Sequence, residues 1–336
     1  TGGVIVAGRR QKKSGRRSYA WRYRGRIVAC VFVEVIIICA LVIMIGWNKG
    51  VKEWFEQFEQ PVLKEVDISG INSPNAILMQ ARGGKILGEI NGEAQIYPAS
   101  MTKIMTVILG IENFDNLDEK ITLTDEMFSG LYEQDATQAG FQPGEEVRVI
   151  DLLYGAMLPS GAECCIALAD TISGSEADFA ELMNKKARKL GMENTHFCDS
   201  TGLHNPDHYS TVKDIAVLMK YCIKNDTFRE IVETSRHSTG VTNIHPDGIT
   251  YYSTMFKNLS DPTVTGGKIL GGKTGYTSEA GHCLVSFAEI EGREYIFVSA
   301  GASGADGNTI PHIQDAVTVY NRVGAAIEAK MNNNNK

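Results

Sequence analysis

A continuous apolar segment, residues 27–47, constrains the fold of this 336-residue chain more than any other feature. Its only charge is Glu34, and a single charge at mid-bilayer costs about 3 kcal/mol, which the other residues outweigh. A helix of this length crosses a hydrocarbon core of about 30 Å and exceeds the roughly 7 to 15 apolar residues of a signal-peptide core. The sequence therefore predicts an N-terminal transmembrane helix.

The formal net charge of −7 is the sum of two unlike parts. Residues 1–26 hold nine of the 33 basic residues and no acid, so the rest of the chain carries 24 basic against 40 acidic residues, a balance of −16. Basic residues stay on the cytoplasmic side during insertion. We interpret the arm as a topology signal that leaves the N-terminus cytoplasmic and the remainder on the outer face of the cell membrane. Nucleic-acid binding by the arm is the alternative, and we predict no nucleic-acid partner.

The exterior part divides by composition into three pieces. Residues 48–70 are polar with scattered aromatics and a proline, which is typical of a juxtamembrane linker. Residues 71–329 have the length and the apolar content of one large domain with a lobe, and residues 330–336 form a polar tail of low complexity.

The periodicity of apolar residues predicts an α+β domain. Two short apolar runs flank Gly83-Gly84, which indicates a hairpin, and the run from Ser100 to Phe114 is apolar on nearly every side, as in a buried helix. Helical spacing dominates residues 121–222, two strand-like runs meet at Glu291-Gly292, and a last helix covers 313–329. We expect the N- and C-terminal strands to meet in one antiparallel sheet packed with helices.

Ser100 and Lys103 stand together at the start of the predicted buried helix. A lysine among apolar neighbours loses hydration of its ammonium, so its pKa falls and it can act as a base near neutral pH. Backbone N–H groups at a helix start suit a developing oxyanion. The pair is therefore a candidate nucleophile and base. Alternatively Ser100 only caps the helix; the chain has a second S-x-x-K, Ser210 to Lys213, in which Ser210 reads as an N-cap.

Lys273-Thr274-Gly275 is the only K-T-G in the chain, and with Gly267 and Gly272 it also satisfies the P-loop pattern. A P-loop requires a buried strand before it and a helix directly after it. Here a turn-rich approach precedes the motif and alternating strand follows it. We therefore predict a strand edge rather than an NTPase site, with the NTPase as the alternative.

A third motif is Ser160-Gly161, at a Pro-Ser-Gly corner between two predicted helices. Taken alone it is a helix–helix turn in which Ser160 caps the following helix.

The three motifs together, in this order, resemble those of the penicillin-recognising serine acyltransferases. The chain is more closely similar to the low-molecular-mass D-alanyl-D-alanine carboxypeptidases of peptidase family S11, which are penicillin-binding proteins. The segments that carry the resemblance are IYPASMTKIMT, MLPSGAE, NTHFCDSTGLHNPDHYST and GGKTGYTSEAGHCLVSF, spread along most of residues 71–325. The resemblance implies a β-lactamase/transpeptidase-like fold with a helical lobe.

The resemblance also implies roles for the motif residues. Ser100 would be the acylated nucleophile, Lys103 its base, and Ser160 a proton relay to the leaving group. Lys273, Thr274, Gly275 and Tyr276 would form the substrate-binding strand, with an oxyanion hole from the N–H groups of Ser100 and Tyr276. The implied substrate is the peptidoglycan stem pentapeptide, which loses its last D-Ala, and β-lactams would be covalent inhibitors. No cofactor is implied.

Two departures from the family pattern bear on substrate binding. The second motif usually reads Ser-x-Asn, but Ala162 occupies the third position and offers no amide. Many relatives also carry an Arg soon after the last strand, and residues 301–310 contain none. We expect substrate binding to be weaker or differently organised, and a catalytically weak wall-binding or sensor protein is the alternative of another class. A class A β-lactamase would need Glu-x-x-x-Asn, whereas Glu181 and Asn184 are one residue too close.

The remaining polar residues predict no further chemistry. His204 and His208 have zincin-like spacing, but Pro206 between them argues against a helix that carries both, so no metal site is expected. Two of the seven cysteines, Cys30 and Cys39, lie in the apolar segment, and the adjacent Cys164 and Cys165 read as core residues. Five cysteines lie outside the apolar segment, and because five is odd, at least one thiol is free or pairs between chains.

Overall fold

The structure is a computed structural model that describes residues 35–36, 63–259, 261–304 and 310–334. The chain divides into two units, Thr1–Gln60 and Pro61–Lys336, and the elements below belong to the second. Within the described ranges, no helix combines the length and the hydropathy needed to cross a membrane. The predicted span 27–47 lies outside these ranges apart from Val35 and Ile36, and so does Glu34, so the transmembrane helix stays a prediction.

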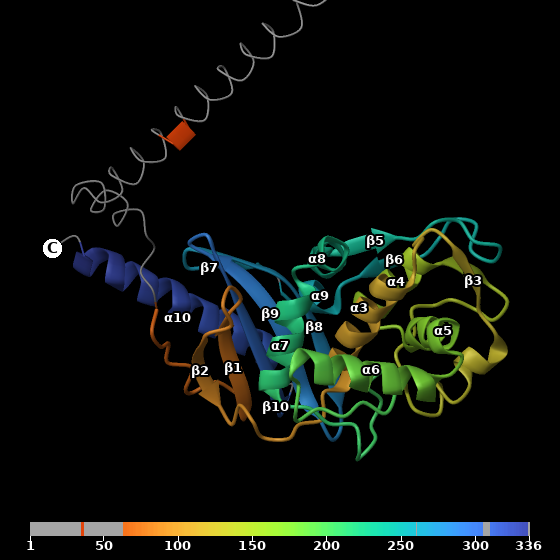
Figure 1. Cartoon of the computed structure of the whole chain (residues 1–336), viewed down its shortest axis with the longest axis horizontal. Helices are drawn as coiled ribbons and strands as arrows, with labels where there is room; N and C mark the ends of the chain where they lie inside the picture. Colours follow the sequence, from red (N-terminus) through yellow and green to blue (C-terminus); the bar gives the residue numbers. More distant parts are fainter. Residues whose placement is uncertain (1–34, 37–62, 260, 305–309, 335–336) are drawn as a thin grey trace, which may run out of the picture. The chain divides into compact units, whose positions relative to one another are not determined.

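A six-stranded antiparallel sheet, in the order β2-β1-β10-β9-β8-β7, forms the centre of the folded unit (Figure 1). N-terminal and C-terminal strands meet in it as predicted, because β1 pairs with β10. Its strands are β1 (Asn75–Gln80), β2 (Ile86–Ile90), β7 (Thr263–Val264), β8 (Gly267–Thr277), β9 (Gly281–Ile290) and β10 (Arg293–Ala302).

Turn chemistry fixes the two hairpins that the sequence predicts. Gly83 and Gly84 join β1 to β2 with φ of 86° and 72°, a left-handed conformation that glycine adopts at little cost. Glu291 and Gly292 join β9 to β10 with φ of 49° and 69°. Both predicted hairpins are confirmed.

Alternating residues of the strands face two separate cores. On β1, Ala76 and Leu78 belong to the core under α10 (Pro311–Asn334), whereas Ile77 and Met79 face the larger core shared with the other helices. Figure 1 shows α10 on one side of the sheet and α3 to α7 on the other. This helix–sheet–helix layering places the edge of β8 against the helical lobe.

The helical lobe contains the predicted buried helix. Every residue of α3 (Lys103–Asn113) from Lys103 to Gly110 is buried, and the 3-10 turn η1 (Ala99–Thr102) leads into it. The other helices are α4 (Val149–Met157), α5 (Ala162–Ser173), α6 (Glu176–Leu190), α7 (Val212–Cys222), α8 (Asp226–Glu233) and α9 (Thr254–Asn258). The lobe also has a 3-10 turn η2 (Asp125–Phe128) and two small sheets, β3 (Lys120–Thr122) with β4 (Glu146–Arg148) and β5 (Arg236–Ser238) with β6 (Thr250–Tyr252).

The structure differs from the expected boundaries at both ends of the domain. Leu63, Val66 and Ile68 are buried in the core under α10, and the Val66 N–H donates to the Leu87 carbonyl, so the end of the predicted linker 48–70 packs as part of the domain. At the other end, α10 continues past Ala329 to Asn334 and includes most of the predicted tail.

Candidate active site

Ser100 and Lys103 meet where η1 runs into α3. Ala99, just before the serine, has a φ of 46°, a left-handed conformation rare for a residue with a side chain. The Lys103 Nζ lies 3.1 Å from Ser100 Oγ and donates to the Thr201 carbonyl at 2.6 Å. Lys103 is 3% exposed, so it does not reach out to solvent, and the alternative in which Ser100 is only a cap is not what the structure shows.

Ser160 is held in a strained conformation at the corner between α4 and α5. Its φ is 73°, and the cost of such a backbone is of order 1–3 kcal/mol, typical of functional sites. The N-cap of α5 is Gly161, and Ser160 makes no capping bond to it. Its hydroxyl instead accepts a hydrogen bond from Lys273 Nζ at 2.9 Å. The capping interpretation of Ser160 is therefore wrong.

Glu163, in the first turn of α5, fastens the segment beside this corner. It is fully buried, and its Oε1 accepts the N–H groups of Ala139 and Gly140 at 2.6 and 2.9 Å. Burial raises the pKa of Glu163 despite these backbone hydrogen bonds. The carboxyl group therefore ties the loop before Phe141 to the start of α5, beside the Ser160 corner.

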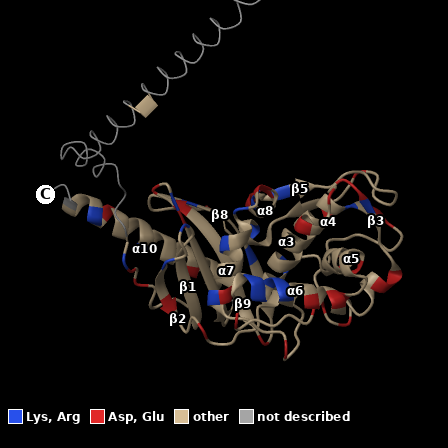
Figure 2. Ribbon diagram, viewed as in Figure 1, with Lys and Arg blue, Asp and Glu red and all other residues tan. Residues whose placement is uncertain are grey.

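Lys273 enters the site from β8 and is 1% exposed. Its Nζ contacts two neutral oxygens in the described part of the chain, Ser160 Oγ and the Thr274 carbonyl, both at 2.9 Å. Burial lowers the pKa of Lys273 well below its ordinary value, and Lys103 lowers it further whenever Lys103 is protonated. The two lysines thus belong to one electrostatic site. Figure 2 shows Lys and Arg gathered where α3, α6 and α7 approach the sheet, with Asp and Glu more widely spread.

Gly275 lets β8 approach the Ser100 turn. A Cβ at Gly275 would lie 3.0 Å from the Ser100 backbone nitrogen and 3.1 Å from the Ala99 Cβ. Because of this contact β8 packs against η1, and Ser100 lies beside Gly275, the residue before Tyr276. The Tyr276 side chain itself is 60% exposed and packs on His282.

Thr274 has a partner that sequence reasoning missed. Its Oγ1 lies 2.7 Å from the Oγ1 of Thr254, the first residue of α9. No motif surrounds Thr254, and only the fold brings it to β8.

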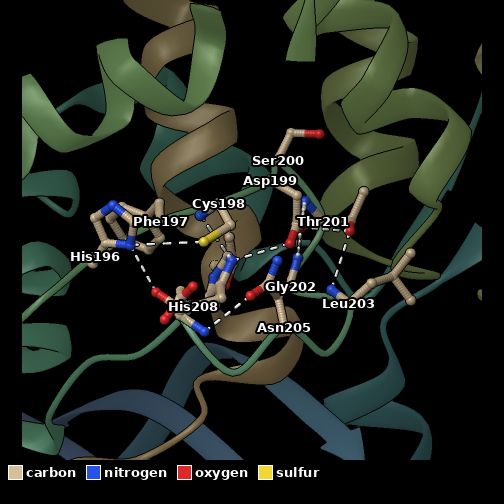
Figure 3. Close-up of polar contacts among 12 residues, drawn as sticks. His196, Phe197, Cys198, Asp199, Ser200, Thr201, Gly202, Leu203, Asn205 and His208 are labelled. Carbon is tan, nitrogen blue, oxygen red and sulfur yellow. Dashed lines mark hydrogen bonds and ion pairs between the residues drawn. The ribbon is translucent and has the colours of Figure 1, made fainter. Parts of the chain in front are cut away.

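The segment 199–208, whose polar contacts Figure 3 draws, packs beside the turn that carries Ser100, and sequence reasoning assigned it no role. Gly202 has a φ of 80°, and a Cβ there would lie 1.9 Å from the Ala99 carbonyl oxygen. The loop therefore packs directly on the turn that carries the serine. Asp199-Ser200-Thr201-Gly202 has the composition of an Asx turn, which is the signal that could have drawn attention to it.

Replacing Gly202 by alanine is expected to destabilise the protein by roughly 2–4 kcal/mol, because a left-handed alanine and a clash with the Ala99 carbonyl add together. The measurement is Tm alongside the labelling rate with fluorescent penicillin. Gly191→Ala is the matched control: Gly191 has the same φ of 80° but no atom within 4 Å of its Cβ position. Equal losses of Tm in the two variants would disprove the close contact.

The second S-x-x-K is not a second site. Lys213 Nζ pairs with Glu93, and the buried Ser210 hydroxyl pairs with Thr195 Oγ1 at 2.8 Å. The N-cap of α7 is Thr211, whose side chain accepts from the Asp214 N–H, so the assignment of the cap to Ser210 is off by one residue.

The remaining candidates have structural roles. Glu181 is exposed, while Asn184 is buried and bonds both backbone polar groups of Phe197 at 2.8 Å, so these two do not form a β-lactamase-like pair. His204 packs edge-on against Tyr97, and His208 lies 3.0 Å from Asp199. The five cysteines in the described ranges, Cys164, Cys165, Cys198, Cys222 and Cys283, are free, and Cys164 and Cys165 lie in the core as predicted.

Comparison with known proteins places this geometry in a family. Residues 62–304 match the family model of peptidase S11, D-alanyl-D-alanine carboxypeptidase. The chain is 35% identical over 231 residues to the D-alanyl-D-alanine carboxypeptidase DacF of Bacillus subtilis strain 168, covering 68% of this chain and 57% of that protein. It is 35% identical over 236 residues to the D-alanyl-D-alanine carboxypeptidase of Streptomyces sp. strain K15, covering 68% of this chain and 78% of that protein.

Solved structures agree with the predicted fold class. The Streptomyces K15 DD-transpeptidase superposes with a TM-score of 0.68 at 29% identity, over 78% of this chain and all of that one. A D-alanyl-D-alanine carboxypeptidase from Mycobacterium tuberculosis H37Rv, at 21% identity, shares the fold with a TM-score of 0.68, over 80% of this chain and 96% of that one. The transpeptidase-like α+β prediction is confirmed. The chain spans about three fifths of the length of curated relatives such as DacF. On the family match and these identities, the chain belongs to peptidase family S11, the D-alanyl-D-alanine carboxypeptidases.

Proposed function

We propose that this protein is a serine-type D-Ala-D-Ala carboxypeptidase that removes the terminal D-Ala of peptidoglycan stem pentapeptides through an acyl-enzyme on Ser100. The observation that carries the proposal is the pair of contacts Lys103 Nζ to Ser100 Oγ at 3.1 Å and Lys273 Nζ to Ser160 Oγ at 2.9 Å. They bring a nucleophile, a buried amine and a second serine–lysine pair together beside an open strand edge. Family membership supports the same assignment.

In the acylation step, neutral Lys103 takes the proton of the Ser100 hydroxyl as its oxygen attacks the carbonyl of the penultimate D-Ala. The backbone N–H groups of Ser100 and Tyr276 receive the developing oxyanion. Ser160 gives its hydroxyl proton to the departing amine of the last D-Ala and takes the proton that Lys103 had accepted, so the C–N bond breaks and Lys103 is neutral again. Water then attacks the ester with Lys103 as base, which releases the shortened peptide and restores Ser100.

Substrate recognition in this proposal depends on β8. The substrate lies antiparallel along the strand, and its terminal carboxylate binds at Thr274 under the positive potential of Lys273. No Arg follows the last strand within residues 301–310, so the hydroxyl of Thr254, 2.7 Å from that of Thr274, completes the carboxylate site. Such a site would be one form of the differently organised binding that the departures from the family pattern predict, weaker binding being the other expectation.

We also propose that residues 27–47 anchor the protein in the cell membrane, with the catalytic domain on the outer face. The charge asymmetry supports it, because the nine basic residues of 1–26 precede the apolar segment. A substrate in the cell wall would then be within reach of the domain. Alkaline phosphatase and green fluorescent protein fused after residue 60 test this topology, since the first is active only outside and the second fluoresces only inside.

The test of the activity uses the purified full chain with a D-Ala-D-Ala peptide and with fluorescent penicillin. We expect D-Ala release and a label on the tryptic peptide that contains Ser100, and an unchanged label in Ser210→Ala, the matched serine of the second S-x-x-K. Absence of label at Ser100 would refute the acyl-enzyme. A label without D-Ala release would favour the wall-binding or sensor protein, and rapid turnover of the penicillin would favour a β-lactamase.

Thr254→Val is expected to raise KM for the peptide about fivefold with kcat within about twofold, because one hydrogen bond to the substrate carboxylate is worth about 1 kcal/mol. Steady-state D-Ala release measures both constants. The control is Thr171→Val: the Thr171 hydroxyl donates to the Ala167 carbonyl within α5 and lies outside the site. An unchanged KM in Thr254→Val would remove Thr254 from the carboxylate site.

A further inference from the structure

Lys103 can act as a base only if its nitrogen lone pair points at Ser100. A neutral lysine amine has two N–H bonds and one lone pair, and rotation about the Cε–Nζ bond interchanges their directions. In this chain Ala162, 1% exposed, has no amide with which to hold the amine. In the described part of the chain, the hydrogen bonds of Lys103 Nζ go to Ser100 Oγ and to the Thr201 carbonyl. The Thr201 carbonyl therefore orients the amine.

The carboxylate of Asp199 fixes the direction of that carbonyl (Figure 3). Asp199 Oδ1 accepts the Thr201 N–H at 2.8 Å, the Thr201 hydroxyl at 2.7 Å and the Gly202 N–H at 2.6 Å. The Thr201 carbonyl and the Gly202 N–H belong to one planar trans peptide unit and point in opposite directions. Holding the N–H of Gly202 on Asp199 thus aims the Thr201 carbonyl away from Asp199 and onto Lys103.

His208 holds the other side of the carboxylate. Its Nδ1 lies 3.0 Å from Asp199 Oδ2, to which it donates when it carries a proton, and 3.2 Å from the Cys198 nitrogen, whose N–H donates to Nδ1 when it carries none. Burial favours the neutral form of Asp199, but the hydrogen bond and charge of His208 outweigh it and lower the pKa of Asp199 to about 2. Asp199 is therefore a carboxylate at neutral pH.

The contacts close into a ring that ends beside Lys103. The Nε2 of His208, which is 2% exposed, hydrogen-bonds the Thr102 hydroxyl at 2.8 Å. Thr102 directly precedes Lys103 in the chain. The loop that carries Thr201 and the turn that carries Lys103 are thus joined by two hydrogen bonds, one from Lys103 to the Thr201 carbonyl and one between His208 and Thr102.

We propose that Asp199 and His208 are positioning residues that hold the Thr201 carbonyl on Lys103 and so aim its lone pair at Ser100, the task for which Ala162 supplies no amide. This inference rests on the proposed function for its kinetic test. It also makes a geometric claim that can be measured without turnover.

Asp199→Ala removes the acceptor of all three loop donors and is expected to lower kcat for D-Ala release about thirtyfold, with KM within about twofold. Asp199→Asn keeps an acceptor oxygen for the loop, and its amide can donate to unprotonated His208 Nδ1. We expect this conservative variant to restore kcat to within about threefold of the parent protein. Thr201→Val removes one of the three donors and is expected to lower kcat about fivefold; as a nearly isosteric change it serves where Asp199→Ala fails to fold.

Glu145→Ala is the matched control, because Glu145 is a fully buried carboxylate paired with His245 at 2.7 Å elsewhere in the lobe. It is expected to lower Tm at unchanged kcat. The inference is overturned if Asp199→Ala or Thr201→Val keeps kcat within twofold, or if Asp199→Asn loses as much as Asp199→Ala.

A crystal structure of Asp199→Ala supplies the readout that needs no activity. We expect the distance from Thr201 O to Lys103 Nζ, 2.6 Å in the parent, to exceed about 3.5 Å, the limit of a hydrogen bond. An unchanged distance would overturn the inference even in an active enzyme. A parent protein that releases no D-Ala would instead overturn the proposed carboxypeptidase activity, and the distance would still decide the positioning role.

Discussion

Replacing Lys103 by methionine is expected to slow acylation of Ser100 about a thousandfold, within the range of 10²–10⁴ that a positioned general base contributes. Methionine has nearly the same length and suits the buried environment of Lys103, which is 3% exposed, so the fold is expected to persist. The measurement is the second-order rate constant for labelling by fluorescent penicillin in stopped flow.

The variant Lys103→Arg distinguishes the role of Lys103 as a base from the role of its positive charge. A guanidinium keeps the positive charge but does not deprotonate in proteins, so it cannot take the Ser100 proton. We expect Lys103→Arg to label as slowly as Lys103→Met. Lys213→Met is the control, because Lys213 has the same S-x-x-K context but pairs with Glu93. An arginine variant that labelled near the parent rate would show that Lys103 acts through its charge alone.

The parts of the site that the sequence could predict are those that local chemistry determines. Ser100 and Lys103 are three residues apart on one face of a helical turn, and the run of apolar residues after them predicts a buried helix. The hairpins at Gly83-Gly84 and Glu291-Gly292 follow in the same way from turn residues.

The parts that it could not predict depend on tertiary contact. Thr201 acts through its backbone carbonyl, which any residue possesses, so its identity carries no signal. Thr254 reaches Thr274 because α9 packs on the edge of β8, across 20 positions of sequence. The local sequence predicts that Ser160 caps a helix. In the structure its backbone is left-handed and its hydroxyl bonds the buried Lys273, and neither feature is visible in the local sequence.

Lys273→Met is expected to lower kcat/KM for the D-Ala-D-Ala peptide by about 10²–10³, the range found for loss of a group that stabilises charge in a desolvated site. The same variant is expected to be more stable than the parent. Lys273 is 1% exposed, and both oxygens that its Nζ contacts in the described residues are neutral. A buried cation without a carboxylate partner is costly, and its replacement by an apolar side chain of similar volume is expected to add about 2 kcal/mol at pH 7.

The sign of the pH dependence follows from the pKa of Lys273, which burial holds well below 10.5 in the folded protein. At pH values between the folded-state pKa of Lys273 and the pKa of an ordinary lysine, the unfolded chain binds more protons than the folded chain. The contribution of Lys273 to the free energy of unfolding therefore rises with pH. The gain in Tm of Lys273→Met over the parent should therefore decrease as the pH rises from 7 toward 10.

Activity is expected to have the opposite dependence, because in the proposed function the substrate carboxylate binds under the positive charge of protonated Lys273. The alkaline limb of kcat/KM in the parent is expected well below pH 10.5, and Lys273→Met should lack it. Lys268→Met is the matched control, because Lys268 lies exposed on the same strand and should change neither Tm nor the pH profile. A Lys273→Met variant that is less stable than the parent, or that retains kcat/KM within tenfold, would show that this lysine supports the fold rather than the carboxylate site. The expected pattern, in which the protein gains stability as it loses activity, is the signature of a charge kept in the core for the substrate that it binds.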